Sequence, residues 1–420
     1  MGRGNSEAHA GLASARHGRL RRSNGWANAG KVLLTGLIVV ALSGISVAAY
    51  AVWGVVSELK TVDLVVPDQE ELEAVGAGAQ SLDGALTILL VGSDSRAGSI
   101  LDDGEVGELN DVNLLLHVSA DHQNATVVSF PRDLMVPIPS CPSEDGQPNY
   151  YPAMSEQMLN SAMMYGGLPC VALTISNLIG MDVPYAGLVT FDGVIGVSSA
   201  IGGVTVCLTE PINDDYTGLY LPAGDNSLSG LDALQFLRTR HGVGNGSDVS
   251  RISNQQIFMS ALVRQLQSSD TLGNPVTVYG LAKAGVENMT LSSNMASVQF
   301  MQALAGTVKD IDLDRINFVQ YPSFTHPYEA GRLTPDYASA QVLVDILVSG
   351  QPFQVVSRGE AVVDTAPAED PAVVPAEEVP VDGTGEATAE PVDPGPVTLP
   401  DNITGQAAAT QTCSAGRTVY

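Results

Sequence analysis

Apolar runs of strand length alternate with helix-like stretches between Leu86 and Val356. LTILLVG, VNLLLHVSA and ATVVSFP have the length of strands, whereas SEQMLNSAMMYGG, VALTISNLIG, GLDALQFLRTRH and DVSRISNQQIFMSALVRQL have apolar residues at helical spacing. Because helices must then cover the faces of a sheet, this alternation predicts an α/β fold with the sheet sandwiched by helices. The polar DHQN between the second and third runs predicts a hairpin turn, so we expect a mixed β-sheet.

A long uncharged run precedes this region. Val32–Val56 contains no charged residue, and about 25 residues can cross a bilayer core of roughly 30 Å. Several basic residues precede the run, which places the N-terminus in the cytoplasm: Arg16, Arg19, Arg21, Arg22 and Lys31. A cleaved signal peptide and a buried core helix are the alternatives, but a signal peptide's apolar region usually has only about 7–15 residues.

These features predict five parts of the chain. They are a basic cytoplasmic segment (1–31), a transmembrane helix (32–56), an extracytoplasmic stalk (57–85), a folded domain (86–356) and a tail (357–420). The tail is rich in Pro, Ala, Val and acid, so we expect it to be disordered, with its end around Cys413 able to dock back on the domain. The protein is therefore predicted at the cell membrane, with a single span and the domain outside.

Charge and cysteine content exclude some classes of function. The net charge of −27 argues against nucleic acid as a partner, since phosphates would repel such a surface. The four cysteines all follow the uncharged run, an even number in an oxidising place, which predicts two disulfides, with free buried thiols as the alternative. No C-x-x-C spacing supports a zinc site.

Acidic and basic residues cluster where the strand-like runs end. If DHQN is the hairpin turn, Asp111 lies roughly opposite residues 132–134, and so meets Arg132 and Asp133. The first run ends in GSDSR, which brings Asp94 and Arg96 to the same end if this strand is parallel to the third. A ligand site at this sheet edge is one interpretation, and a network of salt bridges that ties the loops together is the other.

More arginines follow in LRTRHGVGNGSDVSRISNQQ. Arg238 and Arg240 end one helix, and Asp248 is placed to cap the next. Arg251 and Gln255 are four residues apart, so they share a face of that second helix near its start, where anions bind favourably. The alternative is an arginine on the surface, more so for Arg240 than for Arg251.

Arginines and spare carboxylates together suggest a diphosphate ligand. The guanidinium group holds phosphate oxygens in a bidentate manner. Carboxylates among the arginines suit Mg²⁺ shared with substrate phosphates. An anchored protein that faces outward would meet such a group on a polyprenyl-pyrophosphate carrier lipid, which makes the membrane and a lipid-linked glycan the expected partners.

At these motifs the sequence resembles the LytR–CpsA–Psr family, the cell-wall glycopolymer ligases of Gram-positive bacteria. ILLVGSDSR, NDVNLLLHVS, VVSFPRD, LNSAMMYGG, AIGGVTV, LRTRH and DVSRISNQQ occur in the family's order over roughly 86–356. The pair Cys141 and Cys170, which flanks LNSAMMYGG, is similar to the actinobacterial branch. We expect it to form a disulfide, and by elimination we expect a second one between Cys207 and Cys413.

The resemblance implies an Mg²⁺-dependent phosphotransferase. Such an enzyme moves a glycan from a polyprenyl-pyrophosphate lipid to a sugar hydroxyl of peptidoglycan and leaves a phosphodiester link. By motif, Asp94 and Asp111 would hold Mg²⁺, and Asp111 or Asp133 would take the hydroxyl proton. The diphosphate would be held by Arg96, Arg132, Arg238, Arg240, Arg251 and Gln255, with Asn160 nearby, for which a structural role in its helix is the alternative.

The sequence departs from the family pattern at two places. Leu109 and Asn110 stand where the family often has Arg-Ser, and Asn254 stands where many members carry another arginine. Two other functions therefore stay open: hydrolysis of the lipid pyrophosphate, and a non-catalytic regulatory or binding role in the cell envelope. His117, inside an apolar run, is expected to pack in the core. His241 is expected either to line the opening of the ligand site or to cap a helix.

Overall fold

The computed structural model describes residues 59–65, 82–94, 108–143, 147–268, 274–365 and 396–419, all within the unit Val55–Tyr420. The basic segment, the expected transmembrane helix, most of the stalk and Arg96 lie outside the described residues. Within the part that is described, no helix has the length and apolar character needed to cross a bilayer.

An eight-stranded sheet forms the centre of the fold, in the order β1-β12-β7-β2-β3-β4-β13-β19. These strands are β1 (Lys60–Val62), β2 (Leu86–Ser93), β3 (Asn110–Val118), β4 (Ala125–Phe130), β7 (Tyr185–Val189), β12 (Met289–Ser292), β13 (Ile316–Gln320) and β19 (Gly405–Ala407). β2 runs parallel to β7 and β4 parallel to β13, whereas β3 is antiparallel to both of its neighbours. The predictions of a mixed sheet and of a β3–β4 hairpin are therefore confirmed.

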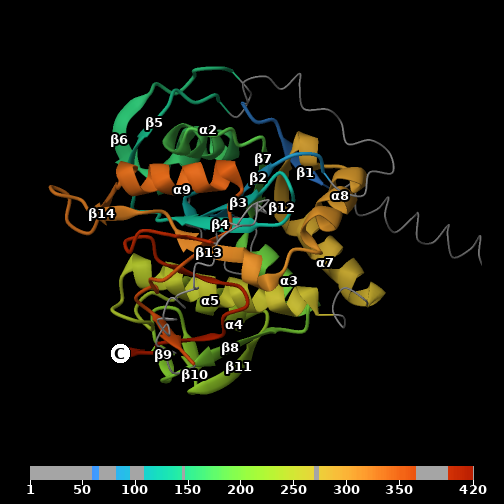
Figure 1. Cartoon of the computed structure of the whole chain (residues 1–420), viewed down its shortest axis with the longest axis vertical. Coiled ribbons are helices and arrows are strands. Elements are labelled where there is room, and N and C mark those ends of the chain that lie inside the picture. Colours follow the sequence, from blue (N-terminus) through green and yellow to red (C-terminus); the bar gives the residue numbers. More distant parts are fainter. Residues whose placement is uncertain are drawn as a thin grey trace, which may run out of the picture. The chain divides into compact units, whose positions relative to one another are not determined.

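Helices cover both faces of this sheet (Figure 1). On one face lie α2 (Gly167–Ile179) and α9 (Tyr337–Ser349). Toward the other lie α3 (Phe191–Ala200), α4 (Leu231–Arg238), α5 (Asp248–Gln267), α7 (Pro275–Asn288) and α8 (Val298–Val308). The apolar core has separate clusters on the two faces of the sheet. Leu89 and Val91 of β2 pack in the cluster that includes residues of α2 and α9, and Leu86 and Ile88 pack in the cluster that includes residues of α8. This strand is buried on both faces, which explains its unbroken apolar sequence.

The segment expected as a helix around LNSA is only partly helical. β6 (Met154–Met158) pairs antiparallel with β5 (Met135–Ile138), and only then does the 3-10 helix η2 (Leu159–Tyr165) begin. The helical prediction is wrong for the first half because pairing with a neighbouring strand overrides local periodicity. The short elements η3 (Ser293–Met295), η4 (Leu313–Arg315), β14 (Ser323–Thr325), β15 (Leu333–Pro335), β16 (Phe353–Gln354) and β18 (Val397–Thr398) complete the main body.

Two smaller sheets pack below α4 and α5 (Figure 1). One has the order β11-β8-β20-β17, from β11 (Gly224–Leu228), β8 (Val204–Leu208), β20 (Thr412–Ser414) and β17 (Val362–Asp364). The other has the order β10-β9-β21, from β10 (Leu219–Leu221), β9 (Ile212–Asp214) and β21 (Thr418–Val419). Residues 357–365 and 396–419 thus belong to the folded body. The predicted tail boundary at Val356 is too early, because these residues find backbone partners far away in the sequence.

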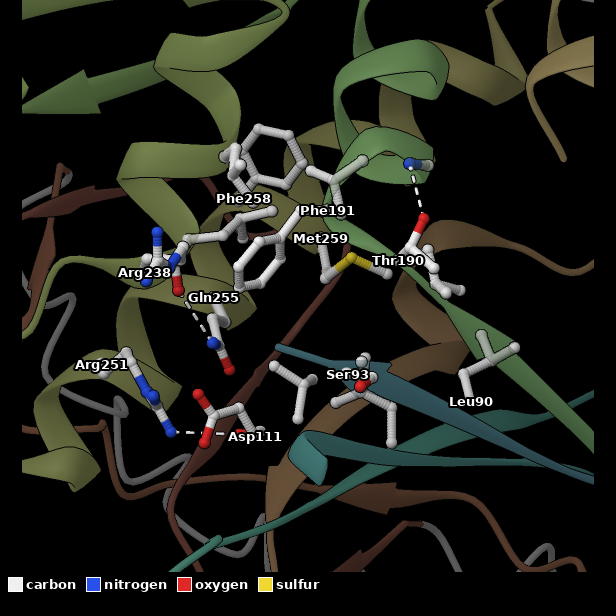
Figure 2. A pocket seen from close by; sticks show the side chains of 18 of the residues that line it. Leu90, Ser93, Asp111, Thr190, Phe191, Arg238, Arg251, Gln255, Phe258 and Met259 are labelled. Atoms are coloured by element: carbon white, nitrogen blue, oxygen red, sulfur yellow. Dashed lines mark hydrogen bonds between the residues drawn. The ribbon is translucent and has the colours of Figure 1, made fainter. Parts of the chain in front are cut away.

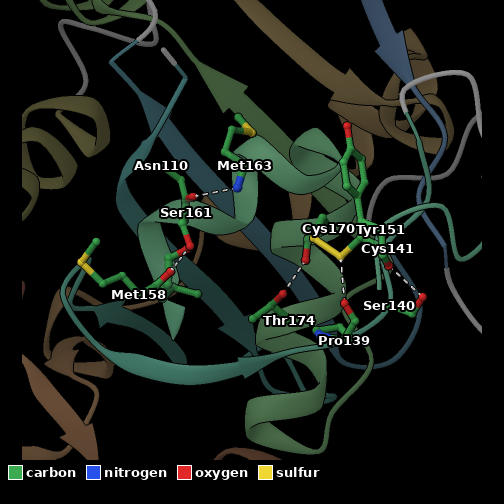
Figure 3. The surroundings of a disulfide bond; sticks show 11 residues. Asn110, Pro139, Ser140, Cys141, Tyr151, Met158, Ser161, Met163, Cys170 and Thr174 are labelled. Carbon is green, nitrogen blue, oxygen red and sulfur yellow. Dashed lines mark hydrogen bonds between the residues drawn. A yellow bond between two sulfur atoms is a disulfide. The ribbon is translucent and has the colours of Figure 1, made fainter. Parts of the chain in front are cut away.

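Both expected disulfides are present. Cys141 and Cys170 join the loop after β5 to the first turn of α2, with their Cα atoms 5.3 Å apart (Figure 3). Cys207 of β8 and Cys413 of β20 are register partners in parallel strands, with a Cα–Cα distance of 4.5 Å. The second bond holds the C-terminal segment to the sheet beneath α5.

Candidate functional site

A cavity of about 470 Å³ lies between the central sheet and helices α3, α4 and α5. The interior of the cavity is apolar, with Phe191, Phe258 and Met259 among the lining residues (Figure 2). Charged side chains gather at one end of the cavity, which we call the mouth. The charged residues are Asp111, Arg132, Arg238, Arg240 and Arg251. A cavity of this size with convergent polar groups at one end suits an amphipathic ligand that has a charged head and an apolar tail.

Asp111 and Arg132 meet at this charged end. The β3–β4 register pairs Asn113 with Phe130. Continued by two residues, the same register places Asp111 opposite Arg132. Arg132 Nη1 donates to Asp111 Oδ1 at 2.7 Å. The hairpin argument from the sequence is thereby confirmed.

Arg132 is surrounded by carboxylates. Its Nε lies 3.7 Å from Asp133 Oδ2 and 3.6 Å from Asp248 Oδ1, although it makes no hydrogen bond within the described chain. Burial lowers the pKa of Arg132, but Asp111, Asp248 and Asp133 outweigh this effect and raise it overall. This guanidinium therefore stays charged.

The start of α5 brings a second arginine to the same place. The cap of the helix is Ser247, whose Oγ accepts from Ser250 N at 3.0 Å, so the expected capping role of Asp248 is wrong. Asp248 instead lies in the first turn and pairs with Arg251 Nη2 at 2.7 Å. Arg251 Nη2 also donates to the Asp111 carbonyl oxygen at 3.1 Å.

Asp248 is a site residue that the sequence argument missed. Burial raises the pKa of Asp248 while Arg251 and Arg132 oppose the shift, and burial lowers the pKa of Arg251 while Asp248 opposes it. From its buried position, the Asp248 carboxylate therefore holds Arg132 and Arg251 in place at the mouth. Its signal in the sequence was an aspartate three residues before an arginine at a helix start.

Gln255, Arg238 and Arg240 complete the charged end. Gln255 Nε2 donates to Leu237 O at 2.9 Å, and Figure 2 shows its amide oxygen turned away from α4, toward Asp111. The Arg238 guanidinium carbon lies 4.5 Å from the centre of the Phe191 ring. Arg240 lines the cavity as well, so these predicted residues all come together.

Other predicted residues lie outside the cavity lining. Asp133 is buried and forms an ion pair with Arg332, which comes from the segment between β14 and β15. Asn160 is 6% exposed, its backbone N–H donates to Arg132 O at 3.1 Å, and its Oδ1 has no hydrogen bond within the described chain. Both residues thus support Arg132 from behind.

Asp94 and Asp111, the two carboxylates predicted to hold Mg²⁺, lie at neighbouring ends of β2 and β3. Asp94 Oδ1 accepts from Leu109 N at 2.8 Å, where β2 and β3 pair through Ser93 and Asn110 next to Asp111. Among the described residues, no three or more His, Cys, Asp or Glu side chains gather into a metal cluster. Since Mg²⁺ readily takes one or two carboxylates and fills its shell with phosphate and water oxygens, this donor set fits an ion that arrives with a phosphate ligand.

The departures from the family pattern have structural roles. Asn110 is fully buried, and its side chain bonds Asn113 Oδ1, Leu159 O and Met163 N. Asn254 bonds Phe236 O and the Ser414 hydroxyl. The histidines follow the expectations: His117 packs in the core between Thr87 and Leu347, and His241 lines the mouth.

The mixed sheet between helical layers places the protein among α/β proteins, with a charged mouth over an apolar cavity. Residues 58–337 match the LytR_cpsA_psr family, and the chain belongs to it. Its fold is shared by the LytR-Csp2A-Psr enzyme from Actinomyces oris, with a TM-score of 0.51 at 20% identity over 69% of this chain and 95% of that one.

Sequence relatives include proteins of Corynebacterium and Bacillus. The chain is 30% identical over 308 residues to the cell wall biosynthesis protein LcpA of Corynebacterium glutamicum, covering 64% of this chain and 56% of LcpA. It is 25% identical over 253 residues to the polyisoprenyl-teichoic acid–peptidoglycan teichoic acid transferase TagU of Bacillus cereus, covering 60% of this chain and 75% of TagU. The chain thus spans about half the length of the Corynebacterium relative.

Proposed function

We propose that this protein is a phosphotransferase that moves a glycopolymer from a polyprenyl-pyrophosphate carrier to a hydroxyl of peptidoglycan. The observation that carries the proposal is the arrangement of four arginines and Asp111 around one end of an apolar cavity. Arginines suit the diphosphate and the apolar interior suits the prenyl chain. Membership in a family whose relatives include a teichoic acid transferase supports the same reaction class.

The reaction needs positioning and charge neutralisation rather than a covalent enzyme intermediate. The acceptor hydroxyl attacks the phosphorus that bears the glycan, the bond to the lipid phosphate breaks, and lipid monophosphate leaves with the electron pair. Arg132, Arg251 and their neighbours stabilise the charge on the phosphate oxygens. Asp111 lines the mouth and can take the hydroxyl proton, whereas Asp133 is buried outside the cavity lining.

Mg²⁺ is part of the proposal as the cofactor. When bound, it would neutralise charge on the diphosphate and on the leaving phosphate. Asp94 and Asp111 would hold it, with the remaining ligands supplied by phosphate and water. Removal of the metal with EDTA should stop transfer, because the charge on the diphosphate would then lack its divalent counterion.

A transfer assay tests this function directly. The purified full-length chain would be given a synthetic prenyl-pyrophosphate sugar, Mg²⁺ and peptidoglycan fragments. Asp94→Ala and Asp111→Ala should lose metal-dependent turnover, and Arg132→Ala and Arg251→Ala should each weaken lipid binding about ten- to a hundredfold. If all four variants melt early and their folded fraction still binds and transfers normally, the residues form a salt-bridge network and the proposal is wrong.

The products separate transfer from hydrolysis. A ligase gives a phosphodiester-linked glycan on the acceptor only when peptidoglycan is present, while a hydrolase releases glycan phosphate with or without it. Binding without any product would indicate a regulatory protein.

We further propose that the chain is anchored in the cell membrane by residues 32–56, with its N-terminus in the cytoplasm. The length of the uncharged run and the basic residues before it support this orientation. Protease added to intact protoplasts should remove the large domain, and full protection would overturn the orientation.

A further inference from the structure

Tyr216 lies at the mouth of the cavity and still presents most of its surface to solvent. It occupies the loop between β9 and β10, lines the cavity, and is 70% exposed. Its ring centre lies 4.4 Å from that of His241, with 31° between the planes. His241 directly follows Arg240, so the two rings stand beside an arginine of the charged end.

A buried carboxylate holds this pair in place. Asp214 is fully buried and accepts from Tyr216 N at 3.0 Å and from the Thr239 hydroxyl. Thr239 Oγ1 in turn accepts from Gly242 N at 3.2 Å. One side chain therefore fixes both the loop that carries Tyr216 and the segment that carries the arginines, so the aromatic pair is pre-organised.

The same segment determines which way the arginines point. Thr239 has extended backbone angles and no exposed surface. Because side chains alternate in extended backbone, Arg238 and Arg240 on either side of Thr239 both face the cavity. Tyr216 packs against His241, the residue after Arg240, which places the aromatic pair with this segment of the cavity lining.

We infer that Tyr216, backed by His241, forms a stacking subsite for the first sugar of the lipid-linked donor. This inference rests on the proposed function. A diphosphate held by the arginines has the prenyl chain on one side and the sugar on the other. The apolar interior takes the chain, so the sugar leaves the site past the arginines, where Tyr216 stands.

The chemistry of both partners fits stacking. A pyranose ring has a face of C–H groups with hydroxyls around its edge, and this face packs on the negative face of an aromatic ring. Tyrosine offers a rigid, amphipathic surface at low cost in conformational entropy. Stacking depends on the shape of the ring rather than on individual hydroxyls, so the subsite would favour a pyranose without selecting one sugar strictly.

Two probes that differ only by the sugar test the inference. They are farnesyl diphosphate and the same lipid carrying one N-acetylglucosamine on its diphosphate, each titrated into the purified full-length chain with Mg²⁺. In the wild type the sugar should tighten binding. Tyr216→Ala should remove about threefold to tenfold of affinity from the sugar-bearing probe and leave farnesyl diphosphate unchanged. Tyr216→Phe, which keeps the ring, should retain the sugar's gain.

Tyr220→Ala provides a matched control. Tyr220 belongs to β10 of the same hairpin, is 60% exposed, and donates to Asp215 Oδ1 at 2.6 Å, but it does not line the cavity. This variant should bind both probes like the wild type. If Tyr216→Ala weakens both probes equally, the ring contacts the lipid and the inference is wrong; it is also wrong if the sugar adds no affinity in the wild type. If neither probe binds the wild type, the proposed function itself fails.

Discussion

Arg240 differs from the other arginines at the mouth in its surroundings. It makes no hydrogen bond or salt bridge to any residue in the described ranges, whereas Arg132 and Arg251 pair with Asp111 and Asp248. The latter two arginines help hold the fold together, so their loss changes both stability and ligand binding. Arg240 instead acts on the other charged residues through its charge alone, for example by lowering the pKa of Asp248, so its loss separates the two effects more cleanly.

Arg240→Ala should therefore weaken binding without weakening the fold. We expect the free energy of unfolding to stay within about 0.5 kcal/mol of the wild type. Affinity for farnesyl diphosphate should fall about ten- to a hundredfold, since a charge-assisted bond to phosphate is lost. Thermal melting and calorimetric titration measure the two quantities. A variant that melts early and binds normally would place Arg240 in the fold rather than in the site.

His117 links stability to pH. Leu347 O can only accept, so His117 donates to it from Nε2 at 3.1 Å and accepts from the Thr87 hydroxyl at Nδ1, 3.0 Å away. This geometry puts the proton of the neutral ring on Nε2, and burial lowers the pKa of His117, against the raising effect of the Leu347 bond. The unfolded chain thus binds a proton at a pH where the folded chain does not.

The sign of the pH effect follows from this difference. His117 contributes stability above its unfolded pKa of about 6.5, and this contribution is lost as the pH falls toward the lowered folded value. His117→Gln, which keeps one donor and one acceptor, should lose less stability than the wild type between pH 7 and pH 5. Urea unfolding at several pH values measures the free energy of unfolding of both proteins. If this free energy falls equally with pH in both, the proposed role of His117 is wrong.

Helix α5 depends on the C-terminal segment along its length. Ser414 Oγ donates to Asn254 Oδ1 at 2.6 Å, Gln406 Nε2 donates to Ser260 Oγ at 2.9 Å, and Arg264 donates to Ala408 O. The Cys207–Cys413 bond ties the segment to β8. The helix that presents Arg251 and Gln255 to the cavity is thus supported from behind by residues more than a hundred positions later.

Asn254→Ala should destabilise the protein by about 1–3 kcal/mol, because it leaves the buried Phe236 carbonyl and the Ser414 hydroxyl without their partner. Gln265→Ala on the same helix is the control, since its side chain makes no hydrogen bond to any residue that the structure describes. Denaturant unfolding measures both variants. Equal stabilities for the two would show that the contact with the C-terminal segment contributes nothing.

At the scale of the whole molecule, residues 396–419 at the C-terminal end contribute strands to several sheets. β19 adds to the edge of the central sheet beside β13, β20 lies between β8 and β17, and β21 pairs with β9. With β18, which pairs with β16, the same segment contributes strands to four sheets. Its loss would leave unpaired strand edges and uncover buried apolar side chains.

A chain that stops after Thr365 should therefore fail to fold. We expect it to aggregate or to bind a dye for exposed apolar surface, while the full-length chain remains folded under the same conditions. Solubility, circular dichroism and dye fluorescence provide the measurement. A truncated chain with wild-type melting would show that the C-terminal strands are not needed for folding.

The sequence alone determined the features that depend on neighbouring residues or on one turn. The β3–β4 hairpin placed Asp111 opposite Arg132 because strand register follows from the turn position. The spacing of Arg251 and Gln255 placed both on the cavity side of α5, because a helix repeats every 3.6 residues. The even cysteine count and the family motifs led to both disulfides.

Only the tertiary structure decided the features that depend on distant contacts. Asp248 belongs to the site because the fold buries it between Arg132 and Arg251. Asp133 lies outside the cavity lining, where Arg332 from another segment pairs with it. Residues 396–419 resemble a polar tail in isolation, yet they fold because β13, β8 and β9 offer edges with which β19, β20 and β21 pair. Backbone hydrogen bonds and buried charge are satisfied by partners far away in the sequence, and no local pattern records which partner that is.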